Sequence, residues 1–185
     1  MVKDEDTLNA LRLILKSVGE DANREGLLET PQRILKSWDT LYGGYKVDPD
    51  SILKTFESDG YNEIILLKDI ELYSTCEHHM LPFIGKAHVA YIPNKRIVGI
   101  SKLARVVEMF SRRMQIQERL TEQVASFIQE KLEPKAVACI IEAQHLCMLM
   151  RGVNKQNSVM VTSSLKGEFL LNQKAREELM NLIKI

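Results

Sequence analysis

The sequence predicts an α+β fold in which one antiparallel sheet packs against helices. Three observations support this prediction: helical periodicity at both ends and in the middle of the 185 residues, strand patterns that come in two pairs, and the almost wholly apolar segment AVACIIEA. Strands joined by short links pair as antiparallel hairpins. A strand without a polar side is covered on both faces.

Residues 1–61 are predicted to form a helical N-terminal region, and residues 62–185 the domain that carries the sheet. The first helix has one apolar face, made of Leu8, Leu11, Ile14, Leu15 and Val18. The second helix begins at Thr30-Pro31, because threonine can cap a helix and proline fits its first turn. It runs to about Tyr42, before two consecutive glycines.

The remaining elements follow in pairs. EIILLKDIELYST suits a bent or two-part strand, and KAHVAYIP a second strand that ends at Pro93. Ser101 can cap the next helix, and a longer helix runs up to Pro134. AVACIIEA and SVMVTSSL form the second pair of strands, and a helix from Asn172 closes the chain. A sheet of about four strands leaves two open edges, so we expect a homo-oligomer that covers them.

The bulk composition is that of an ordinary globular domain, with 45% hydrophobic and 27% charged residues. The formal net charge is +0, so a generally basic surface for nucleic acid is not expected. No apolar run approaches membrane-spanning length, and the charged N-terminus does not resemble a signal peptide. We therefore expect a cytoplasmic protein with no nucleic-acid or membrane partner.

Cysteine and histidine gather in two short windows, each just past a predicted strand. The first, CEHH at residues 76–79, has a Cys-x-x-His spacing that lets a tight turn aim a thiolate and an imidazole at one ion. In the second, HLC at residues 145–147, an extended segment would point both side chains the same way. Cys76, His79 and Cys147 would give zinc three ligands and leave one position open to water.

The neighbouring histidines favour a catalytic site, because His78 and His145 suit proton transfer near neutral pH. The spacing alone also suits a structural zinc site, so both interpretations stay open at this stage. His88, inside a strand, fits a hydrogen-bonded histidine. Cys139, in an apolar strand, fits a buried and inert thiol.

A second group of residues is basic and could hold a polyphosphate. Its members are Lys102, Arg105, Arg151, Arg33 and Lys36. Lys102 and Arg105 lie three apart on one helix face, beside Ser101. Taken singly, each cation also suits an ordinary solvated surface. The carboxylate of Glu118, next to Gln117, can accept two parallel hydrogen bonds from a guanine N–H edge, although it also suits an ordinary helix surface.

Together these stretches resemble the GTP cyclohydrolase I family. The matching segments are TPQRILK, STCEHHMLPFIGKAHVAYIP, GISKLARVVEMFSRR, QIQERLTEQ, EAQHLCMLMRGV and TSSLKGEF. They occur in the family's order with its gaps, and the resemblance covers nearly everything from Arg24 to Phe169. Met114 stands where the family usually has leucine or proline, a difference that involves no chemical group.

The resemblance implies hydrolysis of GTP to 7,8-dihydroneopterin triphosphate and formate, the first step of tetrahydrofolate and pterin biosynthesis. It implies a Zn²⁺ ion on Cys76, His79 and Cys147 that activates water for attack on C8 of the guanine ring. By the same resemblance, His145 protonates the adjacent ring nitrogen and His78 assists proton movement.

Substrate binding is likewise implied by resemblance. Ser101 matches a serine that handles the ribose, and Gln117 and Glu118 match a pair that recognises guanine. The five cations named above match triphosphate-binding positions. The family's tunnelling fold has helices on one face of a small antiparallel sheet, and the sheets of several subunits close into a barrel. Its members are usually decamers of two pentamers with active sites at subunit junctions.

Other classes of protein stay in competition. A pterin synthase would have an all-histidine zinc site, and a nitrile reductase of the same fold would use a cysteine nucleophile without zinc. A zinc-stabilised nucleotide sensor would need no proton-transferring histidines. A cysteine hydrolase, with Cys76 or Cys147 as nucleophile, would keep its activity in a chelator.

Overall fold

The computed structural model describes residues 4–184, and the chain divides into two compact units, Met1–Gly43 and Gly44–Ile185. The first unit consists of α1 (Asp4–Ser17), a 3-10 turn (Glu25–Leu27) and α2 (Thr30–Leu41). Both helices lie where the sequence predicts them, with Pro31 in the first turn of α2, where its missing N–H costs no helical hydrogen bond. Glu29 occupies the capping position of α2, so the prediction that Thr30 caps this helix was wrong. The division predicted between residues 61 and 62 stays a prediction.

The second unit contains the sheet and the helices that cover it. Its strands and helices are β1 (Thr55–Glu57), β2 (Ile65–Cys76), β3 (Pro82–Ile92), β4 (Arg96–Val98), α3 (Ile100–Ser111), β5 (Met114–Gln115), α4 (Gln117–Leu132), β6 (Ala136–His145), α5 (Leu146–Leu149), β7 (Met160–Gly167), α6 (Glu168–Leu171) and α7 (Gln173–Lys184). The main sheet has the order β5-β2-β3-β6-β7, and β1 and β4 form a separate pair. All pairs are antiparallel except β2–β5. The predicted mixture of helices and an antiparallel sheet is confirmed, with β5 as a short addition.

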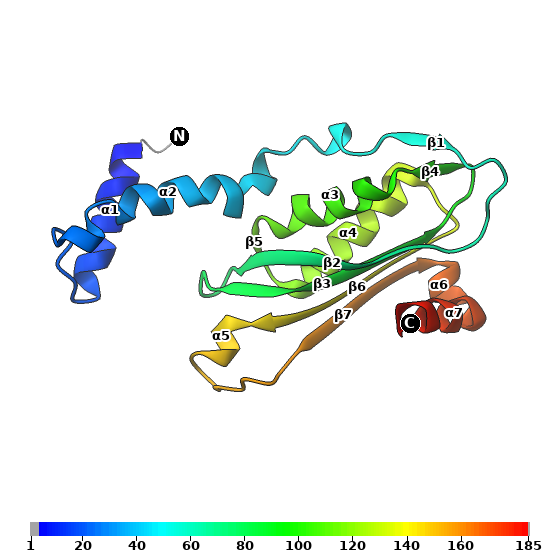
Figure 1. Cartoon of the computed structure of the whole chain (residues 1–185). Coiled ribbons are helices and arrows are strands. Elements are labelled where there is room, and N and C mark those ends of the chain that lie inside the picture. Colours follow the sequence, from blue (N-terminus) through cyan, green and yellow to red (C-terminus); the bar gives the residue numbers. More distant parts are fainter. Residues whose placement is uncertain (1–3, 185) are drawn as a thin grey trace. The chain divides into compact units, whose positions relative to one another are not determined.

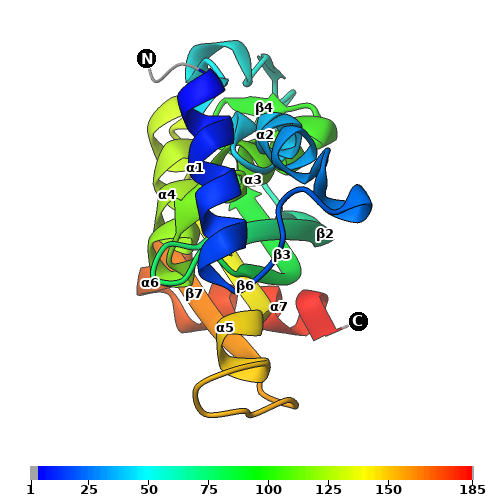
Figure 2. The same cartoon turned by 90° about the vertical axis from the view of Figure 1, so that its left-hand side faces the viewer.

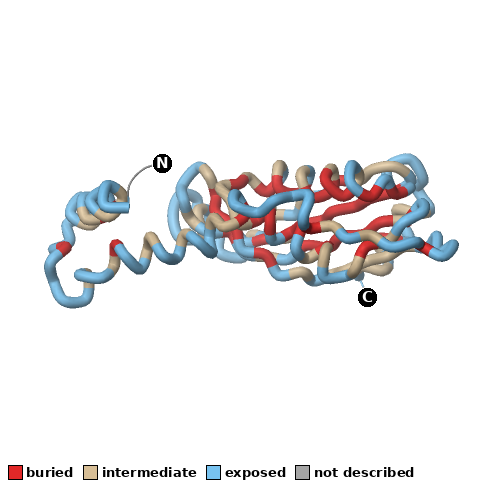
Figure 3. The backbone as a smooth tube through the Cα atoms, turned by 90° about the horizontal axis from the view of Figure 1, so that it is seen from above, coloured by how far each residue is buried: buried red, intermediate tan, exposed pale blue. Residues whose placement is uncertain are grey.

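The sheet is covered differently on its two faces. Helices α3 and α4 lie along one face, and α6 and α7 lie against the other face at one end (Figures 1 and 2). The expectation of helices on one face alone was therefore wrong, because Phe169 of α6 and Leu179 of α7 form a second core against the sheet. Buried residues follow the strands and the inner sides of α3 and α4, whereas the connecting loops are exposed (Figure 3). Among residues 4–184, no helix combines the length and the apolar character needed to cross a membrane.

The side chains on both sides of strand β6 are apolar because each side packs into a core. Val137, Cys139 and Ile141 point into the core under α3 and α4, while Ala136 and Ala138 belong to the smaller core under α6 and α7. Because successive side chains of a strand point to opposite faces, a strand between two cores has no polar side. Each fully buried aliphatic side chain contributes about 1.5–3 kcal/mol to folding. The prediction that AVACIIEA is covered on both sides is confirmed.

Strand β2 is bent, as its sequence predicted. Its register against β3 shifts between Leu67 and Ile70, where Asp69 takes a left-handed backbone conformation with φ 58°. The buried His88 stabilises this bulge, because its Nδ1 accepts a hydrogen bond from the Asp69 N–H at 3.2 Å. The prediction of a hydrogen-bonded histidine at position 88 is thereby confirmed.

Candidate active site

Cys76, His79 and Cys147 meet at one end of the sheet. Each offers one ligand atom, and these three atoms lie within 4.8 Å of one another. Cys76 ends β2, His79 lies in the turn that follows, and Cys147 lies in α5. We call this group the Cys-His-Cys cluster.

The turn after β2 aims His79 back at Cys76. The Cys76 N–H donates to the Leu81 carbonyl at 2.8 Å, and the Met80 N–H donates to the Cys76 carbonyl at 2.9 Å. The Sγ of Cys76 is consequently 3.8 Å from Nδ1 of His79. The tight turn predicted from the Cys-x-x-His spacing is therefore present.

The second window has a different conformation from the extended one considered above. Strand β6 pairs with β3 as far as His145 and Phe83, and α5 begins at Leu146. The next residue of β3 is Pro82, which has no N–H with which to continue the ladder. Cys147 therefore reaches the cluster from a short helix, and the extended conformation was wrong.

Arg119 links the first window to α4. Its guanidinium forms an ion pair with Glu77 and donates from Nε to Oε1 of Gln115 at 3.0 Å and from Nη2 to the Met114 carbonyl at 3.3 Å. The hydrogen bond from Arg119 lowers the pKa of Glu77. In addition, the Glu77 N–H donates to the Gln115 carbonyl at 3.0 Å. Sequence reasoning missed Arg119, because nothing in the helical pattern of α4 distinguishes it from a surface arginine.

His145 lies beside the cluster in a defined orientation. Its ring stacks on Phe83 with centroids 4.6 Å apart and planes 7° from parallel, and its Nε2 lies 2.8 Å from Oε1 of Gln117. Burial lowers the pKa of His145, and the nearby carboxylate of Glu118 opposes this effect. The exposed His78 lies next to His79, with ring centroids 6.2 Å apart.

Gln117 has partners that the sequence did not predict. Its side chain is buried and hydrogen-bonded within the protein, to His145, to two carbonyl groups and to Thr162. Glu118, the other residue of the predicted guanine-recognising pair, is exposed in the first turn of α4. Of the two side chains, that of Glu118 is the one open to a ligand.

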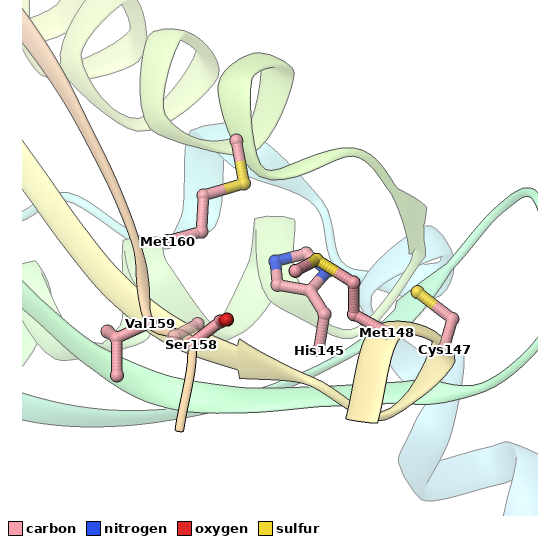
Figure 4. A pocket seen from close by; sticks show the side chains of 7 residues that line it. His145, Cys147, Met148, Ser158, Val159 and Met160 are labelled. Atoms are coloured by element: carbon pink, nitrogen blue, oxygen red, sulfur yellow. The ribbon is translucent and has the colours of Figure 1, made fainter. Parts of the chain in front are cut away.

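A pocket of about 320 Å³ opens beside these residues. It is lined by Ala143, His145, Cys147, Met148, Ser158, Val159 and Met160. Figure 4 shows His145 between Cys147 and the residues that lead into β7. A mostly apolar cavity of this size, with one imidazole and one thiol in its wall, suits a small organic ligand.

The donor atoms of the cluster fit zinc. Two thiols and an imidazole are ligands that zinc prefers, and three protein ligands are the number found in catalytic zinc sites. Burial raises the pKa of Cys147, and the neighbouring Cys76 raises it further. A bound cation would favour the thiolate forms, so these residues suit a divalent metal.

The predicted phosphate-binding residues fall into three places. Arg151 is at the cluster, since its Nη1 donates to Nε2 of His79 at 3.2 Å. Arg33 and Lys36 belong to α2 of the first unit, where Arg33 forms an exposed ion pair with Glu29.

Ser101, Lys102 and Arg105 lie in the first half of α3. Gly99 occupies the capping position, so the prediction that Ser101 caps the helix was wrong. The other end of α3 leads into β5, which pairs with Cys76. At 1.5 Å per residue, Ser101 lies about 15 Å along the helix from that end. Within one chain, the structure does not bring this basic group to the Cys-His-Cys cluster.

Comparison of the sequence with known proteins identifies the family to which it is similar. The family model described as GTP cyclohydrolase I matches residues 7–184. The curated GTP cyclohydrolase 1 of Chlorobaculum tepidum is 54% identical over 98% of this chain and 83% of its own length. That of Wolinella succinogenes is 54% identical over 94% of both chains, and that of Caldanaerobacter subterraneus subsp. tengcongensis is 53% identical over 99% of this chain and 98% of its own length.

One solved structure, a crystal structure of the archaeosine synthase QueF-Like in its apo form, is similar with a TM-score of 0.47 and 15% identity, over 57% of this chain and 94% of its own. The family match, by contrast, extends over almost the entire sequence and includes both windows of the Cys-His-Cys cluster. The chain belongs to the GTP cyclohydrolase I family.

Proposed function

We propose that this protein hydrolyses GTP to 7,8-dihydroneopterin triphosphate and formate, as an enzyme of pterin and folate biosynthesis in the cytoplasm. The observation that carries the proposal is the Cys-His-Cys cluster, whose Cys147 lines one pocket together with His145, in a chain that matches the GTP cyclohydrolase I family over residues 7–184.

Cys76, His79 and Cys147 would hold a zinc ion. When bound, zinc supplies Lewis-acid activation of water near neutral pH. The Cys76–Leu81 turn and the ladder between β3 and β6 hold the three ligands from either side. Arg119 supports the first window from α4 through its ion pair with Glu77.

His145 and His78 carry out the proton transfers. His145 is half-buried in the pocket wall and donates a proton to the imidazole part of the guanine ring, while Phe83 holds its ring plane. His78 is exposed beside His79 and relays protons to solvent. The exposed carboxylate of Glu118, in the first turn of α4, accepts hydrogen bonds from the guanine N–H edge.

A second copy of the chain completes the substrate site. The ribose and triphosphate need Ser101, Lys102 and Arg105, which lie on the far half of α3 from the cluster of their own chain. In an oligomer whose sheets join edge to edge into a barrel, the α3 start of one chain adjoins the cluster of the next. The unpaired edges of β7 and of most of β2 support this arrangement, and a decamer of two pentamers is the form that the family resemblance implies.

Incubation with GTP tests the proposed activity. Formate release and a product that becomes fluorescent on oxidation should appear together and stop when a chelator removes the metal. Zinc added back should restore both. ATP serves as the control, because it does not offer the guanine edge that Glu118 would bind. Activity that persists in the chelator would favour a cysteine hydrolase, and GTP binding without formate a nucleotide sensor.

A further inference from the structure

The side chain of Gln117 connects α4 to β6, β7 and His145. It is 1% exposed. Its Nε2 lies 3.0 Å from the Ile141 carbonyl, 3.0 Å from the Met160 carbonyl and 3.1 Å from Oγ1 of Thr162. Its Oε1 lies 2.8 Å from Nε2 of His145. Every polar atom of this buried amide therefore has a partner inside the protein.

These partners fix which way the amide faces. Carbonyl oxygens only accept hydrogen bonds, so the group that faces Ile141 and Met160 has to be the amide NH₂. The reverse orientation would place Oε1 against two carbonyl oxygens and lose both bonds. The Oε1 of Gln117 consequently faces His145.

Two hydroxyl groups support the same orientation. Oγ1 of Thr121 donates to the main-chain carbonyl of Gln117 at 2.7 Å. This bond uses the only proton of the Thr121 hydroxyl. In the 2.6 Å contact between Thr121 and Thr162, Thr162 is therefore the donor. Oγ1 of Thr162 still has a lone pair for the Gln117 NH₂, so that all the bonds of this network run in one consistent direction.

The amide oxygen in turn determines where His145 carries its proton. An amide oxygen can only accept, so Nε2 of His145 must be the protonated ring nitrogen, and the neutral ring has its lone pair on Nδ1. We infer that Gln117 is a positioning residue that fixes His145 as the Nε2–H tautomer and leaves Nδ1 as the atom that first takes up a proton and then passes it to the substrate. The assignment of the tautomer stands on the hydrogen bonds alone, whereas the role of Nδ1 rests on the proposed function.

A neutral amide differs from the carboxylate that orients histidine in many hydrolases. A carboxylate fixes the tautomer and also stabilises the charged imidazolium. Gln117 fixes the tautomer without adding a negative charge, and Phe83 fixes the ring plane by stacking. The two contacts engage Nε2 and one face of the ring, so Nδ1 is the ring nitrogen that is left for a ligand.

Nitrogen-15 spectra of histidine test the tautomer directly. The protein, labelled only at its four histidines, would be measured in its native oligomeric state by magic-angle spinning, with zinc bound and at a pH where His145 is neutral. Loss of one pair of signals in His145→Asn assigns the residue. The expected result is a protonated Nε2 and an unprotonated Nδ1, and the opposite pattern in the native protein would overturn the inference without any variant.

Two variants then test the role of Gln117. Gln117→Met keeps the volume but loses the acceptor, so the Nε2–H signature should weaken and turnover should fall on the order of 100-fold with little change in KM. Thr162→Val is the matched control, since it removes a partner of the Gln117 NH₂ but leaves Oε1 facing His145, and should keep the tautomer. A raised KM at unchanged turnover in Gln117→Met would overturn the inference in favour of guanine recognition.

The same measurements separate this inference from the proposed function. A native protein that releases no formate from GTP would contradict the proposed function, yet its His145 spectrum would still report the tautomer. A native protein that releases formate but carries the Nδ1–H tautomer would contradict only the role given to Gln117.

Discussion

The three cysteines show how position decides the chemistry of one side chain. Cys139 has no exposed surface and packs in the core of β6, where burial raises the pKa of its thiol. Cys76 ends β2 and Cys147 lies in α5, just past the end of β6, and both are beside His79. The same residue type is thus inert in the middle of the sheet and able to bind a metal at its end.

Exchange of one cysteine at a time tests this difference. In Cys147→Ser, the cluster keeps two strong ligands, so we expect bound zinc to fall well below stoichiometric and formate release to stop. Metal analysis after gel filtration and the formate assay measure the two effects. Cys139→Ala is the control, which should keep its zinc and lose only stability, because it removes core volume. Stoichiometric zinc in Cys147→Ser would contradict the ligand role.

Among the elements, the turn after β2 depends on α4 for its support. Arg119 connects Glu77 of that turn to Gln115 and Met114 of the segment that runs into α4. Because Glu77 lies between Cys76 and the two histidines, this connection would orient the proposed metal ligands without itself binding the metal.

Arg119→Met should weaken this support while keeping the bulk of the side chain. We expect zinc affinity to drop about 10–100-fold, since loss of a residue that orients a ligand has effects of that size. Competition with a chromogenic chelator measures the affinity without any enzymatic assay. Arg112→Met is the matched control, because Arg112 pairs with Glu108 on α3 and stacks over Tyr73. Equal affinities in both variants would show that Arg119 has no such role.

A second connection between elements is the set of hydrogen bonds that Glu122 of α4 forms with β7, and its strength depends on pH. Glu122 accepts hydrogen bonds from Lys166 at 2.6 Å, Ser164 at 2.6 Å and Ser126 at 2.7 Å, and these bonds lower its pKa from 4.5 to about 2. A carboxyl with a lowered pKa in the folded state stabilises the fold above its unfolded pKa and loses that contribution as the pH falls from about 4.5 toward 2.

Glu122→Gln should therefore be less stable than the native protein at neutral pH, and the difference should shrink below about pH 4.5. Urea denaturation at several pH values between 7 and 3 measures the free energy of unfolding for both proteins. Glu130→Gln, on the same helix, is the control. A difference that is independent of pH would mean that the charge of Glu122 does not contribute.

The sequence predicted the long elements better than their short connections. The periodicity of α4 and the bend of β2 were sufficient for prediction, whereas the three-residue strands β1 and β4 and the four-residue α5 carry too little pattern to detect. The Cys-His-Cys cluster was predictable because its ligands are chemically distinctive. The bonds of Gln117 and Arg119 were not, because they join segments that are distant in sequence.

At the scale of the whole molecule, the main sheet has edges at which its strands lack a neighbouring strand over most of their length. Strand β7 forms one edge, and β2 is covered at the other edge only where it pairs with β5. Large side chains are also exposed on the strands, including Val161 at 63% and Ile84 at 42%. Unpaired edges and exposed apolar side chains favour association with further copies.

Mixing two inactive variants tests whether neighbouring copies share a site. One variant carries Cys147→Ser, and the other carries Lys102→Ala together with Arg105→Ala. If each site takes its cluster from one chain and its cations from the next, co-expressed variants should regain about a quarter of the native formate release, because one site in four is then intact on both sides. Each variant expressed alone is the control. No recovery in mixed oligomers of native size would mean that one chain supplies the whole site.

The distance along the chain between Cys76 and Cys147 has a consequence for how the protein is made. A growing chain exposes Cys76 and His79 long before β6 has been synthesised and has carried Cys147 to the same end of the sheet. Two of the three proposed ligands would bind zinc only weakly, so firm binding would require the sheet to have formed. Uptake of the proposed zinc ion would therefore be a late event of folding, and bound zinc would distinguish chains that have folded correctly.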